Sequence, residues 1–135
     1  MTCWLFIATL LIFTGCRAPG GNATSASSGT EIEGRSIELE LIGEPRLGSA
    51  QLKVTVADKS APVEGATVEL MGDMTHAGMV PVIAEAVMDK PGIYLSEGFE
   101  FTMAGDWLIT AEVTFPDGER QNEILPLSVS GREAC

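Results

Sequence analysis

The chain has 135 residues and a formal net charge of −11, with 8 Lys and Arg against 19 Asp and Glu. This length is typical of one domain with its own core and is too short for separate cofactor and substrate domains. Binding to nucleic acid requires clustered Lys and Arg that neutralise phosphates, and the sequence has no such cluster. We therefore expect one acidic domain that does not bind nucleic acid.

The N-terminal residues resemble the signal peptide of a bacterial lipoprotein. Residues 4–13 form an apolar run that suits a signal-peptide core and is too short to span a bilayer of ~30 Å as a helix. Residues 13–16 read FTGC, which resembles the lipobox whose cysteine receives the lipid. Phe13 stands where Leu is usual, and no Lys or Arg precedes the run. An ordinary secretory signal, cleaved or uncleaved, is the alternative.

From this pattern we predict a lipoprotein signal peptide over residues 1–15 and lipidation at Cys16. The protein would then be anchored to a membrane in the cell envelope and face the periplasm or the exterior. Arg17 follows the cysteine, and in a Gram-negative host this residue permits sorting to the outer membrane.

The residues that flank the domain are predicted to have no fold of their own. Residues 16–36 are rich in Gly, Ser, Thr and Ala, and this composition indicates a flexible tether. Residues 131–135 form a short C-terminal tail that ends in Cys135. Because Cys3 leaves with the signal and Cys16 takes the lipid, Cys135 is expected to be a free thiol, with an intermolecular disulfide as the alternative.

Residues 37–130 have the apolar spacing of β-strands. Hydrophobic and polar residues alternate, as in the segment LKVTV at 52–56, so that one side of each strand faces a core. Turn-forming residues separate the segments, and no window keeps a helical period. The candidate strands are residues 37–41, 52–56, 66–70, 82–88, 92–95, 99–103, 107–115 and 123–129.

Seven or eight short strands at this spacing predict an antiparallel, immunoglobulin-like β-sandwich. Trp107 is expected to be a large core residue. Pro126 is expected in an edge strand, because proline cannot donate a hydrogen bond to a neighbouring strand.

Residues 71–81 carry the candidate functional side chains. The segment MGDMTHAGMVP is predicted to be a loop and contains Met71, Met74, His76 and Met79. Thioether and imidazole groups are neutral, soft or borderline ligands that suit Cu(I) better than Zn²⁺, Ca²⁺ or Mg²⁺. Met103 is expected to approach the same end of the sandwich, and either Met71 or Met103 is expected to complete a site formed by Met74, His76 and Met79. Asp73 is expected to orient the His76 ring.

A second interpretation of this loop needs no metal. Methionines often fill irregular gaps at the ends of a core, and a single histidine in a loop is usually solvated. Enzymatic activity is not expected, because the sequence has one histidine, no recognisable nucleophile motif and no reason to pair two carboxylates.

Three segments between residues 57 and 115 resemble the YtkA-like/FixH group of small exported domains. They are APVEGATVEL at 61–70, the Met/His segment at 71–81, and GIY at 92–94 followed by FTMAGDW at 101–107. The resemblance implies an immunoglobulin-like sandwich outside the cytoplasm and an association with copper handling and the assembly of copper-containing oxidases. FixH proteins are anchored by a transmembrane helix, whereas this chain has a lipobox.

Two functional hypotheses follow. In the first, the protein is an exported lipoprotein whose Met/His loop binds Cu(I) for copper handling or metalloenzyme assembly, with a copper protein as its partner. In the second, the domain is a metal-free sandwich that serves as an interaction or spacer module at the cell envelope.

Overall fold

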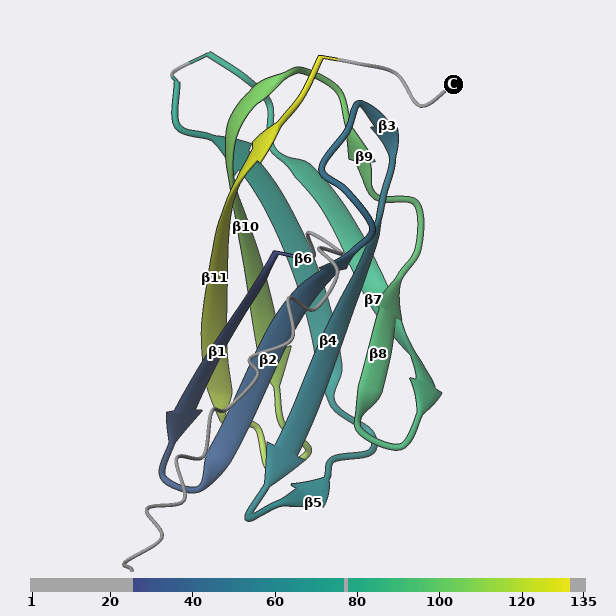
Figure 1. Cartoon of the computed structure of the whole chain (residues 1–135). Helices are drawn as coiled ribbons and strands as arrows, with labels where there is room; N and C mark the ends of the chain where they lie inside the picture. The colour runs from purple at the N-terminus through teal and green to yellow at the C-terminus, as the bar shows by residue number, and fades with distance from the viewer. Residues whose placement is uncertain (1–25, 77, 132–135) are drawn as a thin grey trace, which may run out of the picture.

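The computed structural model describes residues 26–76 and 78–131, which form strands and loops only (Figure 1). These residues do not include the predicted signal peptide, Cys16, the first part of the predicted tether or Cys135. The strands are β1 (Ser27–Ile32), β2 (Arg35–Ile42), β3 (Gly48–Ser49), β4 (Gln51–Asp58), β5 (Ala61–Pro62), β6 (Thr67–Met74), β7 (Val82–Lys90), β8 (Ile93–Ser96), β9 (Glu100–Phe101), β10 (Gly105–Thr114) and β11 (Arg120–Val129).

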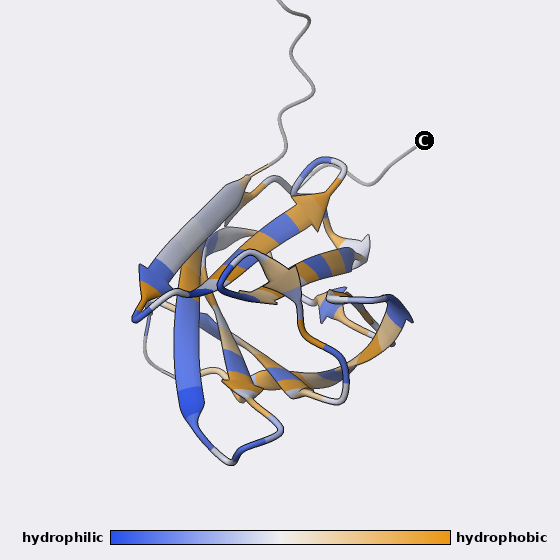
Figure 2. Ribbon diagram, turned by 90° about the horizontal axis from the view of Figure 1, so that it is seen from below, coloured by the Kyte–Doolittle hydropathy of each residue, from blue (hydrophilic) through white to orange (hydrophobic). Residues whose placement is uncertain are grey.

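The main strands form because every second side chain is apolar and is removed from water. In β4, Leu52, Val54 and Val56 are completely buried, whereas Lys53 and Thr55 between them are partly exposed. Burying one such side chain contributes about 1.5–3 kcal/mol. The resulting alternation of apolar and polar residues along the strands is visible in Figure 2.

One antiparallel sheet contains most of the strands, in the order β1-β2-β4-β8-β7-β6-β10-β11, with β5 paired to β4. The sheet curls until its last strand, β11, packs beside β1 and β2. Its two halves therefore face each other across the core as a β-sandwich that is nearly closed into a barrel (Figures 1 and 2). The predicted all-β antiparallel sandwich is confirmed.

The short strands β3 and β9 form a separate pair near one end of the sandwich, in which Gly48 faces Phe101. The predicted strand over residues 99–103 is reduced to the two residues of β9. After Phe101, residues 102–104 connect β9 to β10 and are not part of a strand.

The prediction of a flexible tether up to residue 36 is wrong for its last ten residues. Residues 27–32 form β1, which pairs with β2 from Ser27 opposite Glu40 to Ile32 opposite Arg35. β1 consists mostly of small polar residues, and most of them are exposed. Its hydrogen bonds come from the backbone, so the side chains carry no alternating apolar pattern that reveals the strand.

Two predictions about single residues are confirmed. Trp107 is completely buried, with its ring 5.2 Å from that of Phe101 in an edge-to-face arrangement. β11, which contains Pro126, stands at the end of the sheet order and pairs only with β10 among the described strands.

Arg35, the first residue of β2, forms ion pairs with residues from other segments. The start of β2 lies at the end of the sandwich opposite the loop between β6 and β7 (Figure 1). Its Nε lies 3.1 Å from Asp58 Oδ2, its Nη2 2.5 Å from Asp117 Oδ2 and its Nη1 3.0 Å from Glu119 Oε2. The guanidinium also lies 4.4 Å above the centre of the Phe115 ring. The hydrogen bond from Arg35 holds the pKa of Asp117 below its ordinary value, and this bond also raises the pKa of Arg35.

Candidate functional site

The candidate segment is divided between a strand and a loop. β6 continues to Met74, so the predicted loop over residues 71–81 begins only after that residue. The remaining residues turn back toward β7, and Gly78 adopts a φ of 108° that other residues rarely accept. This division decides which methionines lie together.

One pocket gathers four of the five predicted ligand side chains. It has a volume of about 510 Å³ and opens at the end of the sandwich. Met74 comes from the end of β6, His76 and Met79 from the loop, and Met103 from the connection between β9 and β10. Residues that lie 29 positions apart in sequence, Met74 and Met103, thus line the same hollow. The pocket is completed by Gly78, Val80 and Ala104.

Met71 does not line this pocket. Side chains alternate across β6, so Leu70, Gly72 and Met74 lie on the core side while Met71 lies on the outer side. Met71 is 39% exposed and stands opposite Ile83 of β7. The structure therefore separates Met71 from the other four predicted ligands.

The pocket rests on the aromatic end of the core. Met74 and Met79 are half-buried and pack against the core residues. A Cβ atom on Gly105 would lie 2.7 Å from Met74 Cε, so the missing side chain at that position makes room for the thioether. These contacts place the Met74 and Met79 side chains between the core and the pocket.

The Met103 segment is fixed through its backbone. Trp107 Nε1 donates a 3.0 Å hydrogen bond to the carbonyl oxygen of Met103. The Met103 side chain itself is 54% exposed and lines the pocket. The buried tryptophan therefore holds the backbone of Met103 beside the pocket that Met74 and Met79 also line.

His76 is an exposed residue of the loop. Its Nδ1 lies 3.4 Å from Thr75 Oγ1. The expected contact between Asp73 and the imidazole is not formed, because Asp73 lies on the outer side of β6 and its Oδ1 accepts a 2.8 Å hydrogen bond from the Met74 backbone N–H. Asp73 thus accepts a hydrogen bond from the last residue of β6 instead of orienting the His76 ring.

These donors form a chemically distinctive set. Three thioether sulfurs and one imidazole are available, and no carboxylate lines the pocket. Within residues 26–76 and 78–131, no group of three or more His, Cys, Asp or Glu residues is arranged to hold a metal ion. The pocket instead offers thioethers, the ligand type that a soft monovalent ion prefers.

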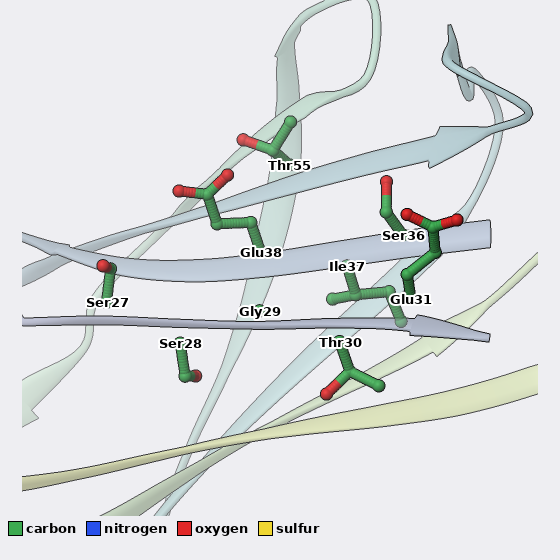
Figure 3. A pocket seen from close by; sticks show the side chains of 9 residues that line it. All are labelled: Ser27, Ser28, Gly29, Thr30, Glu31, Ser36, Ile37, Glu38 and Thr55. Carbon is green, nitrogen blue, oxygen red and sulfur yellow. The ribbon is translucent and has the colours of Figure 1, made fainter. Parts of the chain in front are cut away.

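A second hollow, of about 420 Å³, lies along β1, β2 and β4 (Figure 3). Its lining is mostly hydroxyl groups and carboxylates, including Ser36, Glu38 and Thr55. No histidine, cysteine or basic residue lines this hollow. Its hydroxyl groups therefore lack a neighbouring histidine or lysine of the kind that activates a nucleophile. Apolar patterning does not predict this hollow, because the small polar residues of β1 show no alternation.

No helix in the part of the chain that the structure describes is long and apolar enough to cross a membrane.

Comparison with known proteins identified one family. A family model described as YtkA-like matches residues 30–112, which are more than half of the chain. The match begins within β1 and so includes the last residues of the predicted tether. Neither a curated protein nor a solved structure matches the chain.

Proposed function

The chain belongs to the YtkA-like family, and from this premise we propose that it is an exported lipoprotein that binds Cu(I) in the pocket at the end of β6. The proposed ligands are Met74, His76, Met79 and Met103. The observation that carries the proposal is the meeting of three thioethers and one imidazole, from three separate segments, in one pocket.

The donor set favours a soft ion on two physical grounds. Thioether sulfur is polarizable and uncharged, so it binds Cu(I) well and compensates poorly for the charge of Zn²⁺ or Ca²⁺. Because the ligands are uncharged, release of the ion breaks no attraction between opposite charges. Such a site suits transfer of copper to another protein better than permanent storage. The net charge of −11 further favours the approach of a cation.

An anaerobic titration of Cu(I) against a chromophoric chelator tests the metal site. The protein for this experiment lacks residues 1–15 and carries Cys16→Ser and Cys135→Ser, because free thiols would take copper themselves. We expect one ion per chain, with affinity strongly reduced in His76→Ala and in Met103→Leu. Both side chains are exposed, so these changes leave the core intact.

Matched controls come from methionines outside the pocket. Met71 and Met88 are 39% and 43% exposed and lie on other parts of the sheet. Met71→Leu and Met88→Leu remove a thioether each and should leave the copper affinity unchanged. Equal losses in control and pocket variants would refute the assignment of these ligands. Absence of tight binding in the unmutated protein would leave the metal-free interaction module as the function.

The proposed anchor is tested separately. Mass spectrometry of the membrane fraction should find a mature chain that begins at Cys16 with acyl chains attached. Each buried CH₂ of an acyl chain contributes about 0.8 kcal/mol of membrane affinity, so more than one chain anchors the protein stably. An unmodified soluble chain would refute the lipoprotein assignment without affecting the metal site.

A further inference from the structure

The outward face of β7, β6, β10 and β11 carries an apolar row that no described element covers. The strand register places Ile83 opposite Met71, Met71 opposite Thr110, and Thr110 opposite Ile124. Ile83 and Ile124 are 62% and 52% exposed. Leu108 and Pro126 form the next row toward the candidate pocket and face each other across β10 and β11. We call these four strands' outward surface the outer face.

An acidic row lies beside the apolar one on the outer face. Glu85 stands opposite Glu69, and Glu69 stands opposite Glu112, so three glutamates are direct cross-strand neighbours. Like charges in such positions destabilise a sheet. Two further carboxylates lie on the same face: Asp73 stands opposite Leu108 in the second row, and Asp106 lies one row closer to the candidate pocket, opposite Ser128.

The protein itself neutralises little of this charge. Arg120 Nη1 lies 3.7 Å from Glu112 Oε1, but the Arg120 side chain is 70% exposed and the pair is therefore weak. Among the described residues, neither Glu69 nor Glu85 forms an ion pair. The opposite half of the sandwich differs, since there Glu40 is paired with Lys53 at 2.6 Å.

We propose that the outer face is a docking surface for a protein partner whose contact surface combines apolar side chains with adjacent Lys and Arg. The apolar rows supply area that gains from burial, and the unpaired glutamates select a basic partner. A second copy of this chain is disfavoured as the occupant, because each copy carries a net charge of −11.

The outer face also offers a recess for an anchoring side chain. Leu108, Pro126 and Ser128 line a hollow of about 550 Å³, which extends to Thr75, the residue before His76. A partner that fills this hollow lies next to the loop of the candidate pocket. The docking proposal itself does not require that the pocket bind a metal.

Photo-crosslinking in the cells that produce the protein tests the proposal. The full chain carries a benzophenone amino acid at Met71 or Ile124 on the outer face. In control chains the probe replaces Glu38 or Thr55 on the outward side of β2 and β4. We expect one heterologous protein to be crosslinked from the outer-face positions and not from the control positions.

Once that crosslinked protein is purified, the effect of charge on its rate of association with the chain can be measured. Glu69→Lys should slow its association with the full chain by about tenfold at low salt, because complementary charge acts mainly on the association rate. Glu38→Lys is the matched control and should change the rate by less than about twofold. Reversal of a contacting Lys or Arg on the partner to Glu should restore binding to the Glu69→Lys chain.

Three results would overturn the proposal. They are crosslinks only to a second copy of the chain, equal crosslinking from both faces, and no protein crosslink from either outer-face position. Thermal unfolding of each variant shows whether it is folded. Glu69→Gln is a second variant that removes a negative charge without adding a positive one. We expect its rate of association with the partner to depend less on salt than that of the unmutated chain.

Discussion

Replacement of Gly72 by alanine should destabilise the domain, although alanine is normally accepted in a strand. Gly72 is on the core side of β6, two residues before Met74. A Cβ atom there would lie 2.6 Å from Phe99 Cζ and 3.3 Å from Trp107 Cε3. The first distance is about 0.8 Å shorter than the 3.4 Å at which ordinary contact begins. The added methyl group therefore overlaps an aromatic ring.

Neither ring can move away easily. Phe99 and Trp107 are 1% and 0% exposed, and both pack edge-to-face on Phe101. Extra volume in a packed core costs about 1–3 kcal/mol, which outweighs the gain of about 0.5–1 kcal/mol from replacing glycine in a strand. We expect Gly72→Ala to lower Tm by about 4 °C or more in thermal unfolding followed by circular dichroism.

Gly29→Ala in β1 is the matched control. Its Cβ would meet no atom closer than 3.5 Å, so this change should be neutral or slightly stabilising. A second variant, Gly72→Ala with Phe99→Leu, should recover part of the lost stability because the smaller side chain removes the overlap. A Gly72→Ala protein as stable as Gly29→Ala, or a double variant whose losses simply add, would refute the packing argument.

Two further predictions concern pH. The pKa of Asp117 is lowered by Arg35, so the ion pair contributes stability above the ordinary aspartate pKa of 3.8 and loses it as the pH falls below that value. The difference in unfolding free energy between the unmutated chain and Asp117→Asn should therefore be constant near neutrality and shrink toward strong acid; a difference that persists there would contradict this. Copper affinity should fall toward acid pH because His76 must lose its proton to bind the ion, and His76→Ala should show a flatter profile in the chelator titration.

The local sequence was sufficient to predict the main strands of the core and the side of each that is buried. Strict alternation, as in Leu52, Val54 and Val56, fixes which side chains leave water, whatever the neighbouring strands are. The burial of Trp107 and the edge position of Pro126 follow from ring size and from a missing N–H, which are properties of single residues. The family could also be identified from short matching segments.

Tertiary structure decided which residues share a site. β6 ends at Met74 because it pairs with β10 up to Trp107, and this extra length turns Met71 outward. β1 exists because β2 offers it backbone hydrogen bonds, although its own side chains bury little. Met103 reaches the loop because it precedes β10, and antiparallel pairing places the start of β10 beside the end of β6. The hydrophobic pattern of a segment determines which of its side chains are buried. The length of a strand and its pairing depend on other strands that are distant in sequence.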